Sequence, residues 1–208
     1  MDLDVKQEKI FLFGGAFDPF HLGHLEVIRT LKKMNPTQFR LILIPSSIHP
    51  QKETSNISDK HRMQLLRLVC ESELGCEVSP FEINKGGISW SIDTVTHFEE
   101  VFPNASLVFV VGSDQFFNLH TWKNIKVLCQ KVSFVVLNRG SHVPFKDYDA
   151  YQAEYFEGSR LSTEFVPMTP IDISSTQIRA KLVSGEPCDD FLPSYLLSYC
   201  QDQGVLRG

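Results

Sequence analysis

Residues 14–24 combine backbone and side-chain types that suit phosphate binding, in the sequence GGAFDPFHLGH. Gly14 and Gly15 follow an apolar run, and two glycines at the end of a strand let the backbone approach a bulky anion with its N–H groups exposed. His21 and His24 stand three residues apart, so on a helix they share a face and can donate to one set of phosphate oxygens. The helix N-terminus adds partial positive charge at the same place. This segment therefore predicts a site for a phosphate-bearing ligand.

Two other residues of this segment are expected to act on the helix that follows. Asp18 stands beside Pro19, a pair typical of a helix start, so we expect Asp18 to cap the helix rather than to take part directly in catalysis. Gly23, between the histidines, is expected to leave room for a ligand against the helix. A His-x-x-His pair also occurs in metal sites, but the flanking glycines and the lack of an obvious third ligand argue against zinc.

A second phosphate-binding pattern, ISSTQIR, spans residues 173–179. Ser174 and Gln177 have the spacing of a capping box, which predicts a helix start with exposed backbone N–H groups. Hydroxyl and guanidinium donors that suit a polyphosphate stand beside this start, at Ser175, Thr176 and Arg179. The two patterns lie about 150 residues apart and each follows a predicted strand. Together they predict a two-sided clamp on phosphate groups.

Apolar runs alternate with segments of helical periodicity along the chain, and these elements must position the two patterns. Strands are predicted at residues 9–13, 39–44, 77–81, 106–111, 131–137 and 162–166. Helices are predicted at residues 22–34, 59–73 and 91–102, with two more starting at about Ser174 and Ser194. The least regular stretch is 140–160, which fits a mobile loop or a small insertion.

Continuously apolar strands that alternate with helices indicate a parallel sheet covered on both faces. The fold class expected is a single α/β domain with a Rossmann-like, doubly wound, mostly parallel sheet and helices on both faces. Its core is expected at about 9–185, with a C-terminal helical element at about 186–208. Ligands of such sheets bind at the carboxyl ends of the strands. Chemistry is therefore expected in the turns after Phe13, Ile44, Val111 and Leu137.

Composition excludes several classes of protein. Of 208 residues, 42% are hydrophobic and 22% charged, and no apolar run approaches the ~18 residues of a membrane span. The N-terminus mixes acids and bases where a signal peptide would be basic and then apolar. Twenty Lys and Arg against 25 Asp and Glu give a net charge of −5 without a basic cluster, which argues against nucleic-acid binding.

Cysteine usage bears on the compartment. The five cysteines form no CxxC pair, which indicates neither a disulfide framework nor a zinc ribbon. Reduced thiols in a cytoplasmic protein are expected. The sequence leaves open whether the protein forms a homo-oligomer.

The two phosphate-binding patterns carry a resemblance to a known family. GGAFDPFHLGH resembles the GGxFDPxHxGH motif of the nucleotidyltransferase superfamily that shares HxGH with class I aminoacyl-tRNA synthetases. ISSTQIR resembles the ISSTxIR motif of the adenylyltransferases in that superfamily. From about residue 10 to the end, the chain is similar to the bacterial nicotinate-mononucleotide adenylyltransferases. The landmarks between the motifs are PSSIHPQK at 45–52, SWSIDT at 89–94, VGSD at 111–114, Thr121-Trp122 and NRG at 138–140.

This resemblance implies a reaction and a set of residue roles. The 5′-phosphate of nicotinate mononucleotide would attack the α-phosphorus of ATP, with Mg²⁺ on the phosphates, giving deamido-NAD and pyrophosphate. The catalytic residues would be His21 and His24, and the ATP site would comprise Gly14, Gly15, Phe17, Ser174, Ser175, Thr176 and Arg179. The acceptor site would comprise Lys52 for the phosphate, Trp122 stacked on the pyridine ring, Ser91 and Lys123 near its carboxylate, Asp114 for ribose hydroxyls, and Arg139.

Three positions depart from the family pattern. Gln51 stands where the family often has a phosphate-contacting histidine, although Lys52 keeps a cation beside it. Trp90 lies in SWS at 89–91, where the family has SYT. Lys123 stands where the family usually has an aromatic residue whose backbone N–H contacts the carboxylate. A lysine there can favour a carboxylate over an amide, but the sequence leaves the preference for acid or amide open.

Other interpretations stay open at this point. Trp122 can be an ordinary core residue, Asp114 a turn residue, and Arg139 a surface charge. The same chemistry on nicotinamide mononucleotide or another phosphate-bearing acceptor is the alternative function. A nucleotide-binding sensor without catalysis is a further alternative, although both histidines and Arg179 are intact.

Overall fold

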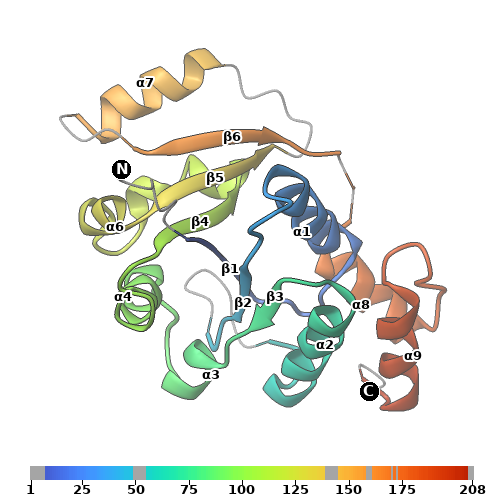
Figure 1. The fold of residues 1–208 in the computed structure, drawn as a ribbon. Helices are drawn as coiled ribbons and strands as arrows, with labels where there is room; N and C mark the ends of the chain where they lie inside the picture. Colours follow the sequence, from blue (N-terminus) through green and yellow to red (C-terminus); the bar gives the residue numbers. More distant parts are fainter. Residues whose placement is uncertain are drawn as a thin grey trace.

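Six parallel strands form one sheet in the part of the protein that the computed structural model describes, residues 8–48, 55–138, 145–157, 161–169, 171 and 173–205 (Figure 1). The strands are β1 (Lys9–Gly15), β2 (Leu41–Pro45), β3 (Cys76–Val78), β4 (Ser106–Gly112), β5 (Ser133–Asn138) and β6 (Thr163–Pro167). Their order across the sheet is β3-β2-β1-β4-β5-β6, and each neighbouring pair is parallel. This is the strand order of the doubly wound Rossmann fold, so the predicted fold class is confirmed.

Helices lie on both faces of this sheet. They are α1 (Leu22–Met34), α2 (Asp59–Ser72), α3 (Phe81–Lys85), α4 (Ser91–Val101), α5 (Ser113–Phe116), the 3₁₀ turn η1 (Leu119–Thr121), α6 (Ile125–Lys131), α7 (Phe145–Tyr155), α8 (Ser175–Ser184) and α9 (Ser194–Asp202). Figure 1 shows α1, α2 and α9 on one side of the central strands and α4 and α6 on the other. None of the helices in the described ranges has the length and apolar character needed to cross a membrane.

Alternation along the strands divides the core into two layers. In β1, Phe11 and Phe13 belong to the cluster that α1, α2 and α9 cover. Ile10 and Leu12 point the other way, into the cluster that contains residues of α4, α6 and α7. Successive side chains of a strand face opposite sides of a sheet, so a strand covered on both faces must be apolar throughout. This requirement explains the uninterrupted apolar runs in the sequence.

The switch in strand order lies between β1 and β4, at the centre of the sheet. Lys9 pairs with Ser106 in β4, and Phe11 pairs with Leu41 in β2. The connections after β1 and β4 lead to opposite sides, so a crevice is expected at the carboxyl ends of these two strands. β1 ends at Gly15 and β4 ends at Gly112, which places the glycine-rich segment at this switch point.

Three predicted elements differ from the structure. The strand expected at 77–81 ends at Val78, and Phe81 begins α3, because Pro80 lacks an N–H to donate to a neighbouring strand. The strand expected to start at Lys131 starts at Ser133, because Lys131 is the last residue of α6, which was not predicted. The stretch expected to be irregular contains α7, at residues 145–155.

The helix α7 owes its position to aromatic packing. The rings of Tyr148 and Tyr151 have their centroids 5.9 and 5.6 Å from that of Phe116. Such pairs bury large areas with favourable ring geometry. The helical spacing of apolar residues indicates this helix poorly, because the side chains that pack on Phe116 are those of two tyrosines. Residues 139–144 and 158–160, which belong to the same predicted stretch, lie outside the described residues.

All five cysteines are free thiols. Burial raises the pKa of Cys70 and Cys76 to about 12, and that of Cys129 and Cys200 to about 11. The thiolate is the reactive form of cysteine, so these four side chains are poor nucleophiles near neutral pH. Their place is in or against the apolar core rather than in a catalytic role.

Candidate active site

The segment after β1 folds back over the end of its own strand. Phe17 has a φ of +46° and is buried, and the Asp18–Pro19 peptide bond is cis. A Cβ on Gly15 would lie 3.2 Å from the nearest ring atom of Phe17, which is tighter than an ordinary contact. Gly15 is therefore needed for the Phe17 ring to cover the strand end. The same glycine accepts a hydrogen bond from the Ser46 N–H at 2.9 Å, which joins the ends of β1 and β2.

The two histidines form a stacked pair at the start of α1. His21 is the N-cap residue, and the ring centroids of His21 and His24 lie 3.8 Å apart with 27° between their planes. The His21 backbone N–H donates to Nδ1 of His24 at 3.2 Å. Because Nδ1 accepts this bond, the hydrogen of the neutral His24 ring is on Nε2. The pair therefore lies on one face of the helix start, as the spacing predicted.

Apolar rings surround His24. The centroids of Phe13, Phe17 and Phe20 lie 6.0, 5.0 and 5.3 Å from its ring. A hydrogen bond that His24 makes in such surroundings is electrostatically stronger than the same bond in water. The ring is also held by packing on several sides, so its orientation is set before a ligand arrives.

Gly23 makes room for the His21 ring. A Cβ at this position would lie 3.0 Å from Cε1 and Nδ1 of that ring. The ring would have to shift by a few tenths of an ångström to admit a side chain here. The predicted room for a ligand against the helix stays a prediction.

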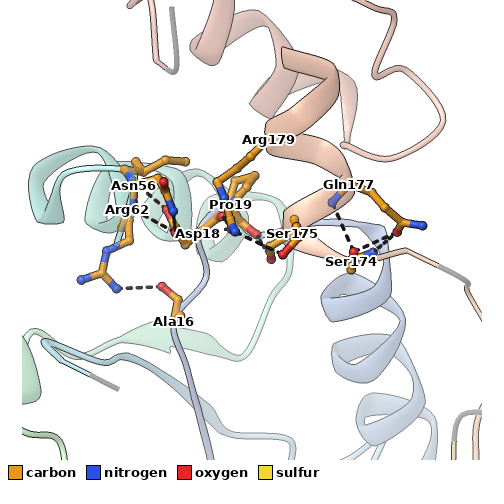
Figure 2. Close-up of polar contacts among 11 residues, drawn as sticks. Ala16, Asp18, Pro19, Asn56, Arg62, Ser174, Ser175, Gln177 and Arg179 are labelled. Atoms are coloured by element: carbon orange, nitrogen blue, oxygen red, sulfur yellow. Dashed lines mark hydrogen bonds and ion pairs between the residues drawn. The ribbon is translucent and has the colours of Figure 1, made fainter. Parts of the chain in front are cut away.

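Asp18 is a junction between three parts of the chain rather than a helix cap (Figure 2). It is 5% exposed, and its Oδ1 accepts from the Ile57 N–H at 2.7 Å. Its Oδ2 accepts from the N–H and side-chain amide of Asn56, at 2.9 and 3.0 Å. Arg179 Nη1 lies 3.4 Å from the same oxygen and donates to the Asp18 carbonyl at 2.7 Å. The predicted capping role is wrong, because His21 is the N-cap residue of α1.

The helix α8 begins where the second pattern predicts. Ser174 is its N-cap residue: the Ser174 hydroxyl accepts from the Gln177 N–H at 3.2 Å, and the Ser174 N–H donates to Gln177 Oε1 at 2.8 Å. This is the expected capping box. One turn inside, Arg179 Nη2 donates to the Thr176 hydroxyl at 3.2 Å.

The two phosphate-binding patterns touch each other. The Ser175 hydroxyl donates to the Pro19 carbonyl at 3.2 Å, and Arg179 bonds to Asp18 (Figure 2). These contacts join residues 156 and 161 positions apart in the sequence. The predicted meeting of the two segments is therefore observed. Exposed N–H groups of one helix start, two histidine rings and a guanidinium come together there, a donor set that suits an anionic oxygen cluster.

Two of the predicted acceptor residues, Ser91 and Lys123, lie at or beside the start of α4. Ser91 is the first residue of α4 and follows Trp90, its N-cap residue. Lys123 Nζ lies 5.1 Å from the centroid of the Trp90 ring, within the range of a cation–π contact. Trp122 meets the Phe109 ring edge-on, with centroids 5.8 Å apart and planes at 81°. Trp122 is half-buried and packs on the core while one part faces solvent.

Asp114 lies at the carboxyl end of β4, in the first turn of α5, and is exposed. A Cβ on Gly112 would come within 2.5 Å of Asp114 Oδ1, so the carboxylate folds back over the strand end and would have to move if Gly112 carried a side chain. The Asn118 amide donates to the Asp114 carbonyl at 2.8 Å. Lys52 and Arg139, the other predicted contacts to phosphate, lie outside the described residues.

Arg62 is a structural residue of the site that sequence reasoning missed. Its side chain is fully buried. It donates to the Ala16 carbonyl at 2.7 Å (Figure 2) and to the Ser46 carbonyl, also at 2.7 Å. It also pairs with the half-exposed Asp59 at 2.6 Å. Arg62 thereby ties the segments after β1 and β2 together and leaves a fixed cation beneath them. Arg62 stands three residues before Leu65 and seven before Val69, which places it on the apolar face of α2. This spacing is the sequence signal that could have identified Arg62 as buried.

Comparison with known proteins agrees with this geometry. Residues 12–181 match the family described as cytidylyltransferase-like. A probable nicotinate-nucleotide adenylyltransferase of Clostridium tetani is 33% identical over 203 residues, covering 96% of this chain and 100% of the relative. The Salmonella gallinarum relative of the same name is 29% identical over 209 residues, covering 94% and 97%.

Solved structures share the fold. The nicotinic acid mononucleotide adenylyltransferase of Plasmodium falciparum complexed with NaAD superposes with a TM-score of 0.75 at 17% identity, covering 96% of this chain and 97% of that one. The crystal structure of a putative nicotinate-nucleotide adenylyltransferase from Vibrio parahaemolyticus superposes with a TM-score of 0.66 at the same identity, covering 96% of each chain. At 17% identity this likeness concerns the fold alone. On the sequence matches, the chain belongs to the cytidylyltransferase-like family and, within it, to the nicotinate-nucleotide adenylyltransferases.

Proposed function

We propose that this protein transfers the adenylyl group of ATP to nicotinate mononucleotide, giving deamido-NAD and pyrophosphate in NAD biosynthesis. The observation that carries the proposal is the contact between its two phosphate-binding segments, through Arg179 on Asp18 and Ser175 on Pro19. The relatives named above support the choice of substrates. The five free thiols fit the reducing cytoplasm, where we place the reaction.

The reaction needs alignment and charge stabilisation more than a nucleophilic side chain. The acceptor phosphate is already an anion, and one of its oxygens forms a bond to the α-phosphorus of ATP. The bond from that phosphorus to the bridging oxygen breaks, and pyrophosphate leaves with the electron pair. Holding the two phosphates in line removes much of the entropic barrier. Donors fixed around the transferring group stabilise the charge that develops there.

The first segment is proposed to hold the ATP phosphates near the reacting centre. Gly14, Gly15 and Phe17 would line the nucleotide, with His21 and His24 donating to the phosphate oxygens through the transition state. Ser174, Ser175, Thr176 and Arg179 would hold the β and γ phosphates. Ser175 and Arg179 now donate to main-chain carbonyls, so their hydrogen bonds are shared with, or passed to, the nucleotide when it binds.

Mg²⁺ is proposed to enter with ATP rather than to occupy a protein-built site. Among the described residues, no cluster of three or more His, Cys, Asp or Glu side chains is arranged to hold a metal ion. The Asp18 carboxylate is already engaged by Asn56, Ile57 and Arg179. This donor set fits a magnesium ion that is ligated mainly by phosphate oxygens and water, as Mg²⁺ often is. When bound, the ion neutralises phosphate charge.

The acceptor is proposed to lie against Trp122 at the start of α4. Trp122 would stack on the pyridine ring, Ser91 and Lys123 would face its carboxylate, and Asp114 would contact ribose hydroxyls. Lys52 and Arg139 stay predicted phosphate contacts. The start of α4 has no side-chain cap, so its first N–H groups are suited to a carboxylate.

Pyrophosphate release with ATP and Mg²⁺ tests the proposal, with nicotinate mononucleotide and nicotinamide mononucleotide compared as acceptors. A strong preference for the acid supports the proposed reaction. Equal use of both, or preference for the amide, overturns the acceptor while keeping adenylyl transfer. If neither mononucleotide gives pyrophosphate release but ATP binds, the result favours a nucleotide-binding sensor or another phosphate-bearing acceptor.

Truncating Trp122 to alanine is expected to raise the KM for nicotinate mononucleotide about tenfold, because stacking on a flat ring contributes about 1–3 kcal/mol. The KM for ATP is expected to stay within about twofold. Steady-state kinetics with each substrate varied in turn measures both values. Trp122→Phe keeps an aromatic face and serves as the matched control. An unchanged KM in the alanine variant removes Trp122 from the acceptor pocket.

Replacing Lys123 with glutamine is expected to lower the preference for acid over amide about threefold to fivefold. An exposed charge contact is worth up to about 1 kcal/mol, and the uncharged amide gains nothing from it. The ratio of kcat/KM for the two mononucleotides measures the effect, at low and high salt. Lys126→Gln, an exposed lysine on the adjacent helix, is the matched control. An unchanged ratio means that the Lys123 ammonium does not reach the acceptor.

A further inference from the structure

The side chain of Glu82 is a buried carboxylate that lies next to Ser89 and Thr94, near the proposed acceptor site. Glu82, on α3, is 8% exposed, and the Thr94 hydroxyl donates to its Oε1 at 2.5 Å. The Ser89 hydroxyl lies beside the same carboxylate and acts to lower its pKa. Burial raises the pKa of Glu82, while these two hydroxyls and the charges of Lys85 and Arg62 act in the opposite direction. Burying a carboxylate costs free energy unless hydrogen bonds replace those that it made to water.

Ser89, which lies beside Glu82, is bonded to residues 47–48, which follow β2. The Ser89 hydroxyl accepts from the Ser47 N–H at 2.9 Å, so it can donate its own hydrogen to Glu82. The Ser89 N–H donates to the Ile48 carbonyl at 2.9 Å, and the Ile48 N–H donates to Gly87 at 3.2 Å. Residues 47–48 are thereby fixed against 87–89. In the sequence they lead directly toward Lys52, the predicted contact to the acceptor phosphate.

Through Thr94, Glu82 also reaches the start of α4. The Thr94 N–H donates to the Trp90 carbonyl at 3.3 Å, and its hydroxyl lies 3.4 Å from the same carbonyl. The first turn of α4 carries Ser91 next to Trp90. Glu82 is therefore bonded to α4 through Thr94 and lies beside Ser89, which binds residues 47–48.

We propose that Glu82 is a positioning residue for the acceptor, which locks residues 47–48 and 89–91 in the spacing that the mononucleotide needs. This inference rests on the proposed function. The Thr94 hydroxyl donates to Glu82, and the Ser89 hydroxyl, which accepts from Ser47, lies beside the same group with its own hydrogen to donate. A carboxylate offers both hydroxyls an acceptor oxygen, whereas an amide accepts at one oxygen and presents its own N–H₂ at the other position. The chemistry therefore requires the acid at this place. Substrate does not touch Glu82 in this proposal, so its effect passes through Ser89 and Thr94.

Glu82→Gln tests the proposal by separating acceptor binding from the other steps. We expect the KM for nicotinate mononucleotide to rise about tenfold, with the KM for ATP and kcat within about twofold of wild type. Thr94→Val, which removes one donor, is expected to raise the same KM about threefold to fivefold. Combining Thr94→Val with Glu82→Gln is expected to cost less than the product of the two single effects, because both act on one contact.

Two matched controls accompany these variants. Glu73→Gln changes the glutamate at the C-terminal end of α2, whose side chain is largely buried and pairs with Arg29 of α1. Thr30→Val changes a buried threonine on α1. Neither is expected to alter the KM for the acceptor. An unchanged acceptor KM in Glu82→Gln overturns the positioning role, and so does an equal fall in every parameter that follows a lower melting temperature. Failure of the proposed function is distinct, because wild-type protein is then inactive with both mononucleotides.

Discussion

Replacement of His24 by alanine is expected to lower kcat for adenylyl transfer about a hundred- to a thousand-fold, the usual cost of removing one donor from a developing oxyanion. The His24 ring is oriented by the His21 N–H on its Nδ1 and by packing against Phe17 and Phe20. In the proposed reaction, Nε2–H of this ring is the donor to the transferring phosphate. The bond strengthens as charge develops, so kcat falls more than the KM for ATP rises. Pyrophosphate release at saturating ATP and acceptor measures the effect.

His61→Ala is a matched control for this variant. His61 lies on α2, and its Nδ1 is 2.8 Å from the Tyr199 hydroxyl of α9. Turnover of His61→Ala is expected to stay within about threefold of wild type. Turnover close to wild type in His24→Ala would refute a contact between this ring and the transferring phosphate. Melting temperatures of both variants separate loss of chemistry from loss of fold.

The arrangement of strands and helices followed from the sequence wherever local rules decide the structure. The helix predicted at 22–34 is α1, because its apolar spacing and the Asn35-Pro36 stop agree. Ser174 caps α8 as its spacing with Gln177 predicted, since both partners lie within one helical turn. The short elements α3, α5 and α6 were missed because four to seven residues carry too little periodicity to be read.

The candidate site was predictable in its motifs but not in its supports. Asp18 was assigned to the nearest helix, whereas its partners Asn56 and Ile57 lie 38 and 39 residues away in the sequence. The contact between Gly23 and the His21 ring was missed for a related reason: the direction of a ring cannot be inferred from spacing alone. Long-range partners depend on how the loops cross the sheet edge, and local propensity contains no information on that crossing.

Two departures from the family pattern turn out to be neighbours in space. Lys123 lies over the ring of Trp90, 33 positions earlier in the sequence. Trp90 stands where the family has tyrosine, and Lys123 stands where the family usually has an aromatic residue. The Trp90 ring therefore contacts the ammonium group of Lys123. The contact gives both changes one structural explanation, and it is the reason why Lys123→Gln is informative about the choice between acid and amide.

Asp18→Asn is expected to lower the free energy of unfolding by about 2–3 kcal/mol, because hydrogen bonds to a buried charged group contribute about 1.5–3 kcal/mol. The change keeps the shape of the side chain but presents an N–H₂ group to donors that now converge on it, from Ile57, Asn56 and Arg179. Urea denaturation at neutral pH measures the loss. Glu186→Gln, which breaks an exposed pair with Lys181, is the control and is expected to cost less than about 1 kcal/mol.

The same variant separates a structural role for Asp18 from one in nucleotide binding. Arg179 bonds to both the carbonyl and the carboxylate of Asp18, so loss of the carboxylate leaves the guanidinium held to the loop that carries the histidines through the Asp18 carbonyl, without the ion pair. We expect the KM for ATP to rise about tenfold at temperatures where the variant stays folded, while the KM for nicotinate mononucleotide changes little. A stability loss with an unchanged KM for ATP would confine Asp18 to holding the fold. Wild-type stability would mean that the donors around Asp18 find water instead, and that the contact between the two phosphate-binding segments does not depend on this carboxylate.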